Sequence, residues 1–113
     1  LTGAAIVSFR RDEERLRLME QLQQYSLDSN TERMKTLVAG EQVIPLERFS
    51  TLPVSIRESQ RPMSVARRGK ALTLLTASPQ APGTVIFVDI ADNQAGRPEI
   101  THLMLMDIQR AGR

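Results

Sequence analysis

The sequence predicts an α+β domain in which N-terminal helices pack on one face of a small antiparallel sheet. Helical patterns fill the first half of the chain and strand patterns the second, a segregation typical of α+β proteins rather than of alternating βαβ units. Short turn sequences join the strand candidates, which favours a meander of neighbouring strands. A length of 113 residues suits one domain, so we expect residues 1–113 to form a single unit.

The composition excludes several kinds of site. Cysteine is absent, which rules out disulfides, thiolate nucleophiles and cysteine-bound metals. Aromatic residues make up only 4% of the chain, so the core must be aliphatic. The net charge of +2 is smaller than a dedicated nucleic-acid binder carries, and we expect no nucleic-acid partner. No apolar run reaches the roughly 18 residues of a membrane span.

The chain opens on an apolar segment, Leu1–Ser8, which has two interpretations. It is either a short first strand or the end of a helix that began in a membrane upstream, since the Arg10-Arg11 pair that follows is a common interface anchor. The pattern then predicts a helix over Asp12–Tyr25. Its apolar stripe consists of Leu18, Met19, Leu22 and Tyr25.

A second, shorter helix is expected after residue 30. Ser29 and Glu32 have the spacing of a capping box, with Ser29 as the N-cap. The helix runs to Ala39, and Gly40 is expected to end it. Three of its residues are expected to point inward: Met34, Leu37 and Val38.

Two prolines bound the third expected helix. Pro45 suits the first turn of a helix over Leu46–Leu52, and Pro53 ends that helix because its ring clashes with the carbonyl four residues before it. Periodicity does not decide whether Val54–Glu58 is helical or extended.

The remaining patterns are those of strands. Residues 63–65 and 71–76 read as a hairpin with a basic tip around Gly69. The most hydrophobic run, Gly83–Asp92, is rich in β-branched residues and lies between turn signals, so we expect a central strand covered on both faces. In a last strand, Ile100–Ile108, alternation puts Ile100, His102, Met104, Met106 and Ile108 on one face and Thr101, Leu103, Leu105 and Asp107 on the other.

His102 is the single histidine, and a Ser-His-Asp triad or a histidine-bound metal would have to use it. Asp89, Asp92 and Glu99 lie near it in sequence and are the candidate companions around a divalent ion. The pattern favours a partly buried histidine whose ring is satisfied by a backbone carbonyl. We therefore expect no resident metal.

Arg67, Arg68 and Lys70 form a basic hairpin tip, the candidate site for a phosphate or lipid headgroup, although a solvated turn is the favoured interpretation. The chain has no catalytic motif or phosphate-binding loop. Its paired carboxylates lack the apolar pocket that would raise a pKa. We therefore expect no catalytic residues, no cofactor and no enzymatic activity.

The order of the elements resembles a known family. A helix rich in Glu, Leu and Gln (residues 13–24) leads to the Leu-Pro element at residues 49–53. A basic hairpin follows, and then Gly-Thr-Val-Ile-Phe-Val-Asp-Ile-Ala-Asp-Asn (residues 83–93) and Pro-Glu-Ile (residues 98–100). This pattern is similar to the extracytoplasmic sensor domains of bacterial two-component sensor histidine kinases. One departure is that the family usually enters a membrane helix after Glu99, whereas residues 101–113 stay amphipathic.

The resemblance implies a PAS-like domain in the periplasm, between two membrane helices of an inner-membrane kinase. It implies a homodimer that binds an unidentified signal ligand and transmits the signal through its N-terminal helix. Two alternatives stay open. One is a small ferredoxin-like binding module or enzyme with residues 4–9 as its first strand, and the other is a structural subunit of a bacterial envelope or secretion assembly.

Overall fold

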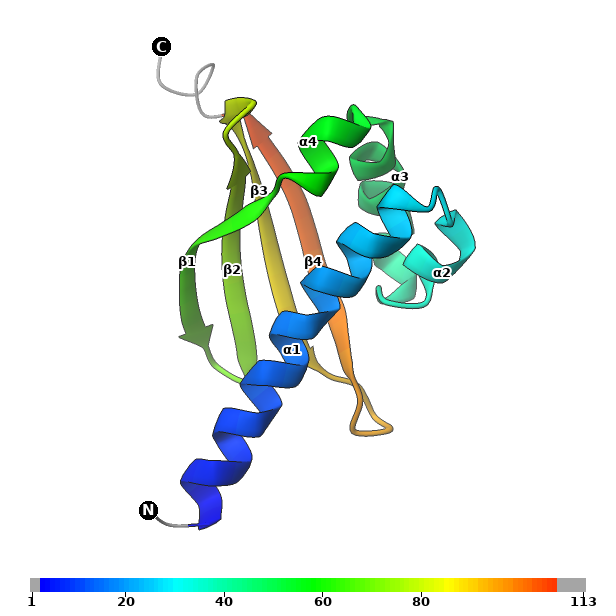
Figure 1. Ribbon diagram of the computed structural model, residues 1–113. Helices are drawn as coiled ribbons and strands as arrows, with labels where there is room; N and C mark the ends of the chain where they lie inside the picture. The colour runs from blue at the N-terminus through cyan, green and yellow to red at the C-terminus, as the bar shows by residue number, and fades with distance from the viewer. Residues whose placement is uncertain (1–2, 108–113) are drawn as a thin grey trace.

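The computed structural model describes the backbone of residues 3–107 and the side chains of residues 12–107. Helical elements come first and strands last, as expected for an α+β domain (Figure 1). The helical elements are α1 (Gly3–Leu27), α2 (Thr31–Lys35), the 3₁₀ turn η1 (Gly40–Gln42), α3 (Val43–Thr51) and α4 (Val54–Glu58). The strands are β1 (Arg61–Arg68), β2 (Ala71–Ser78), β3 (Ala81–Asp92) and β4 (Pro98–Asp107).

The four strands form an antiparallel meander in the order β1-β2-β3-β4. β3 is therefore an interior strand, paired with β2 on one side and β4 on the other, which confirms the prediction of a central strand. The hairpin between β1 and β2 is also confirmed. Its turn contains Gly69, whose φ of +62° lies in a region that favours glycine.

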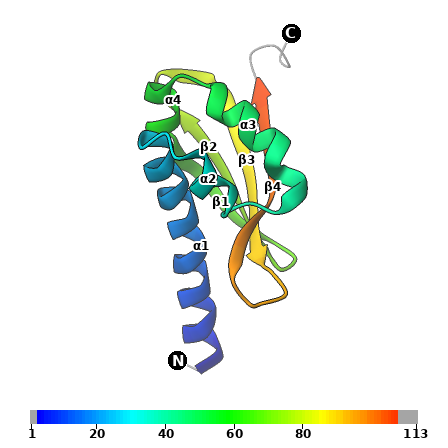
Figure 2. The same ribbon diagram turned by 90° about the vertical axis from the view of Figure 1, so that its right-hand side faces the viewer.

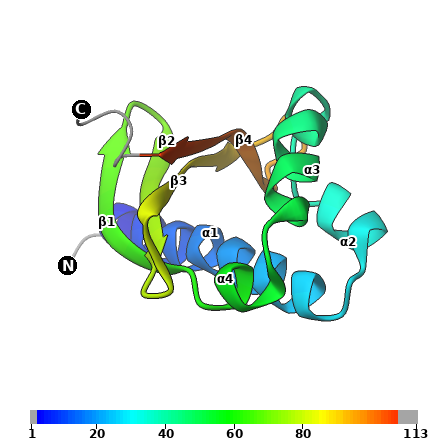
Figure 3. The same ribbon diagram turned by 90° about the horizontal axis from the view of Figure 1, so that it is seen from above.

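The helices cover one face of the sheet. Figures 2 and 3 show α1 and α4 on the same side, with no helix of the described chain on the other. Along β3 the residues that face the helices, Ile86, Val88 and Ile90, are buried. On the opposite face Val85 is also buried, but Phe87 and Asp89 are only half-buried. The expectation that this strand is covered on both faces is therefore wrong, because the helices supply only one layer. We call the uncovered side the open face.

A continuous aliphatic core fills the space between helices and sheet, as the scarcity of aromatic residues implied. Burying such side chains contributes about 25 cal/mol per Å² of apolar surface, the main force that holds α1 against the sheet. The cluster combines four parts of the fold: Leu18, Met19 and Leu22 of α1, Met34, Leu37 and Val38 beyond it, Leu46 and Phe49 of α3, and Leu72, Leu74, Ile86, Val88, Ile90, Ile100 and Leu103 of the sheet.

α1 is longer than its apolar stripe predicted. It begins at Gly3 instead of Asp12, so the interpretation of residues 4–9 as a first strand is wrong, and with it the ferredoxin-like alternative loses its defining element. The stripe itself is confirmed, since Leu18, Met19 and Leu22 are buried. The N-terminal part of α1 extends past the end of the sheet in Figure 1. Among residues 3–107, no helix is both long enough and apolar enough to cross a membrane.

The connection from α1 to α3 corrects two predicted boundaries. Asn30, not Ser29, caps α2, because its side chain accepts a hydrogen bond from the Arg33 N–H at 3.1 Å; Ser29 has a φ of +54° instead. α2 ends at Lys35, and Val38 forms a parallel bridge with Ile100 of β4. The helix pattern continued past Lys35 because extended residues here also turn apolar side chains into the core.

Gly40 opens η1 rather than ending a helix. α3 starts at Val43, which leaves Pro45 in its first turn as predicted, and ends at Thr51 beside the predicted stop. The undecided segment 54–58 is the short helix α4.

β4 contains an irregularity that alternation did not predict. Asp89 pairs with His102 and Ile90 pairs with Ile100, so Thr101 is an extra residue in β4. Such a bulge shifts the side-chain alternation by one position. Ile100 and Leu103 therefore both enter the core, and the predicted common face of Ile100 and His102 is wrong. Ile108, assigned to the same face, lies outside the described residues.

Candidate functional site

Asp89 and His102 face each other across β3 and β4 on the open face. The Thr73 hydroxyl donates a hydrogen bond to the Asp89 carboxylate at 2.6 Å. The His102 ring meets Phe87 edge to face, with centroids 5.8 Å apart and planes at 78°. These contacts fix both side chains through neutral partners on neighbouring strands.

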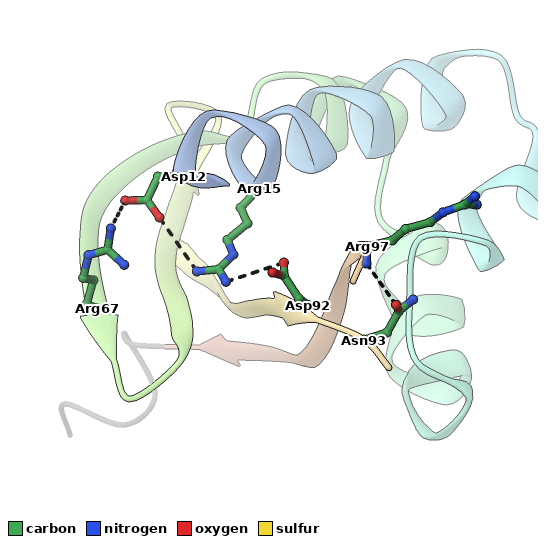
Figure 4. A network of polar contacts seen from close by, with 6 residues as sticks. All are labelled: Asp12, Arg15, Arg67, Asp92, Asn93 and Arg97. Atoms are coloured by element: carbon green, nitrogen blue, oxygen red, sulfur yellow. Dashed lines mark hydrogen bonds and ion pairs between the residues drawn. The ribbon is translucent and has the colours of Figure 1, made fainter. Parts of the chain in front are cut away.

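Asp92 and Glu99 do not join this pair. Asp92 lies on the helix-covered side, where its carboxylate is 3.5 Å from the Arg15 guanidinium of α1 (Figure 4). Glu99 pairs with Ala91 near the start of β4, on the other side of the bulge from His102. The side chains described for residues 12–107 include no group of three or more His, Asp or Glu residues placed to share a metal ion. The bulge and the strand alternation separate residues that are close in sequence.

The three basic residues of the hairpin are also separated. Arg67 pairs with Leu72 and lies on the helix side, where its guanidinium donates to the Asp12 carboxylate of α1 (Figure 4). Arg68 lies on the open face, and Lys70 is in the exposed turn. A single anion at the tip would therefore not contact all three, because adjacent strand residues point to opposite sides.

The open face has a shallow depression of about 800 Å³. It contains the Asp89–His102 pair and thioether side chains, an apolar floor with few charges. Its lining residues are Arg68, Phe87, Asp89, Thr101, His102, Met104 and Met106.

A second cavity, a groove of about 540 Å³, lies between α1 and the β1 side of the sheet. One wall is α1 and the other is the segment from the end of α4 into β1, so anything bound there contacts both layers of the fold. Its lining residues are Leu16, Met19, Glu20, Gln23, Gln24 and Leu27 of α1, with Glu58, Gln60, Arg61, Pro62 and Thr76 opposite. We refer to this cavity as the α1 groove.

Gln60 is a buried polar residue in the lining of the α1 groove. The residue is 2% exposed, its Oε1 accepts a hydrogen bond from the Thr76 hydroxyl at 2.9 Å, and its backbone carbonyl accepts one from the Gln23 side chain of α1. Its Nε2 has no hydrogen-bond partner among the described residues. A buried donor without a partner is costly, about 1–3 kcal/mol. A bound group that displaces the neighbouring side chains and accepts a hydrogen bond from this buried atom would therefore be stabilised.

The choice of amide orientation for Gln60 does not change this conclusion. If the Gln60 amide were turned over, Nε2 would donate to Thr76 and Oε1 would lack a donor. Either way one polar atom of a buried amide lacks a partner beside an apolar wall that includes Leu16 and Met19. The site therefore suits an uncharged polar group attached to an apolar one.

Sequence reasoning missed the α1 groove entirely. Its residues come from three segments that only the fold brings together, and none belongs to a motif. One signal was present: a run of glutamines, including Gln23 and Gln24, on the margin of the apolar stripe of α1. Comparison of the chain with family models, with curated proteins and with solved structures finds no match.

Proposed function

We propose that the chain is a non-catalytic signal-sensing domain in which a small molecule in the α1 groove changes the position of α1 against the sheet. The observation that carries the proposal is the composition of the groove, one wall from α1 and one from residues 58–62 and β2. A ligand between two layers can bind differently to two arrangements of them, which is the condition for transmitting a signal.

The ligand class follows from the groove. The unpartnered amide atom of Gln60 requires a carbonyl or an amide N–H, while Leu16, Met19 and Pro62 offer apolar contact. We propose an uncharged amide or carbonyl compound with a branched aliphatic group. Pockets of this kind take specificity from a few polar groups in an apolar wall.

α1 is the element suited to pass the signal on. It is one uninterrupted helix of 25 residues, so a tilt imposed at Gln23 is carried along its length toward Gly3. In this proposal the domain belongs to a membrane-bound sensor histidine kinase, lies in the periplasm and pairs as a homodimer. The resemblance of the sequence to sensor domains supports this part of the proposal.

The test is an amide-shift titration with N-acetylleucinamide, which carries both carbonyl and N–H groups and an isobutyl side chain. We expect saturable shifts at Met19, Gln23, Gln60 and Thr76. Isovalerate, a carboxylate of similar shape, should bind more weakly because the two glutamates of the groove, Glu20 and Glu58, outnumber its one cation, Arg61.

A matched pair of variants locates the binding site. Gln24→Trp places a large ring over the groove and should abolish the shifts. Gln21→Trp adds the same ring at an exposed position of α1 outside the groove and should leave them unchanged. Equal binding to both variants would refute the assignment of the ligand to this groove.

A structural subunit of an envelope assembly is the second candidate, and the exposure of every residue of β1 favours it, because open strand edges are sites of chain association. Sedimentation velocity distinguishes the two. A discrete high-order assembly that forms without ligand would support the structural role, whereas a monomer or dimer would support sensing.

A further inference from the structure

The two edge strands of the sheet, β4 and β1, differ in how their outer backbone groups are hydrogen-bonded. Along β4 the edge is occupied: the Ala39 N–H donates to the Ile100 carbonyl at 2.8 Å, and the Ile100 N–H donates to the Leu37 carbonyl at 2.8 Å. Further along, the Leu103 N–H donates to Gln42 Oε1 at 3.0 Å. Within residues 3–107, β1 at the other edge pairs with β2 alone, and all eight of its residues are exposed.

Part of β1 is suited to accept a further strand. Pro62 has no N–H, and the pairing register shifts between Pro62 and Ser64, so the first residues of β1 are blocked in the way edge strands often are. From Ser64 to Arg68 the register with β2 is regular. Val65, at the centre of this stretch, is 50% exposed and offers an apolar contact to an added strand.

The charge of this edge indicates what it would bind. The chain has no Asp or Glu between residues 59 and 88, but it has four cations there, at Arg61, Arg67, Arg68 and Lys70. A second copy of the chain would bring the same cations to this edge, and like charges opposite each other are destabilising. An acidic strand meets the opposite field, which favours its approach and fixes its register.

We propose that residues 64–68 of β1 form a docking site for an extended acidic segment of a partner protein, which pairs as a fifth strand. Backbone hydrogen bonds supply the affinity in strand addition and the side chains supply the specificity. Here Arg68 on the open face and Arg67 on the helix side would each receive a carboxylate, supplied by two adjacent residues of the partner strand.

The site is linked to α1. The Arg67 guanidinium already donates to the Asp12 carboxylate, and Asp12 is also 3.8 Å from the Arg15 guanidinium, which in turn contacts Asp92 (Figure 4). A partner carboxylate at Arg67 competes with Asp12. Docking at β1 therefore weakens one of the contacts that hold α1 to the edge of the sheet.

The probe is an acetylated and amidated eight-residue peptide, Val-Glu-Glu-Val-Glu-Glu-Val-Glu, titrated into ¹⁵N-labelled protein. Its adjacent glutamates lie on opposite faces of an added strand. We expect saturable amide shifts at residues 64–68, at their partners in β2 and around Asp12, whose contact with Arg67 the peptide weakens. The affinity should fall as salt is added. Arg68→Glu should weaken binding by about tenfold or more, the size expected when one close charge contact is reversed. Arg97→Glu changes an equally exposed cation in the β3–β4 turn and should have no effect.

Two further peptides separate strand addition from simple charge attraction. A peptide with N-methylated valines keeps its charge but loses the N–H groups that pair with an edge, and it should not bind. A peptide with lysine in place of every glutamate should not bind either. Equal binding of the N-methylated or the lysine peptide would overturn the proposal, as would the absence of shifts at residues 64–68. Self-association through these residues at higher protein concentration would identify a second copy as the occupant and would also overturn it.

Discussion

Arg57 connects three helices, and replacing it with methionine should destabilise the fold substantially. The residue is 8% exposed. From α4 its Nε donates to the carbonyl of Leu52, the residue that follows α3, at 2.8 Å. Its Nη1 donates to the hydroxyl of Ser26 in α1 at 2.5 Å. Methionine keeps the apolar stem but removes both donors.

The magnitude follows from the neutral partners left behind. A hydrogen bond to a charged group contributes about 1.5–3 kcal/mol, and Ser26, at 1% exposure, stays buried when its donor is lost. Burying a guanidinium is itself costly, so part of the loss is recovered when it is removed. We expect a net loss of about 3 kcal/mol in the free energy of unfolding, which lowers Tm by about 12 °C for a domain of this size.

Urea unfolding of a double-mutant cycle measures this contact directly. Ser26→Ala and Arg57→Met, alone and together, should show a coupling energy of about 1.5 kcal/mol, since each single change already breaks the same bond. Arg48→Met, at an exposed position of α3, serves as a control that should change stability by less than about 0.5 kcal/mol. Strict additivity, or a stability of Arg57→Met equal to that of the unmodified protein, would refute the reasoning.

Three other perturbations have defined outcomes in thermal or chemical unfolding. Leu22→Ala removes a fully buried side chain of α1 and should lower the free energy of unfolding by about 3 kcal/mol. Gln21→Ala, at the preceding and exposed position, should lower it by less than about 0.5 kcal/mol. Similar losses of stability for both variants would mean that α1 does not cover the core. Asn30→Ala removes the cap of α2 and should cost about 1 kcal/mol, with Asn30→Asp close to neutral. Gly69→Ala places a side chain at a φ of +62° and should lower the free energy of unfolding by about 1 kcal/mol. Unchanged stability of this variant would contradict the prediction.

The pattern of apolar residues was enough to predict the α+β architecture, because it shows which side chains are buried in the core. The apolar stripe of α1 and the β-branched run of β3 reflect contact with the same core, and the turn at Gly69 requires a residue that tolerates positive φ. These features are local, so they can be read without knowing the partner segments.

Long-range contacts are the reason that other features were missed. Val38 forms a β-bridge with Ile100, which lies more than sixty residues away in sequence. Helix propensity depends on neighbouring residues and could not predict this contact. The extra residue at Thr101 changes which side His102 faces, because a bulge depends on the pairing of both strands. The α1 groove was not predictable for the same reason, since Gln60 meets Gln23 only after α1 and β1 are in place.

The most direct test of the sensing proposal is the distance between α1 and the sheet. The chain has no cysteine, so spin labels can be placed at Gln21→Cys in α1 and at Gln80→Cys in the β2–β3 turn, both exposed and outside the groove. We predict that saturating N-acetylleucinamide shifts the measured distance distribution, and that adding Gln24→Trp abolishes the shift. A distribution that stays the same when the groove is shown to be occupied would contradict transmission through α1.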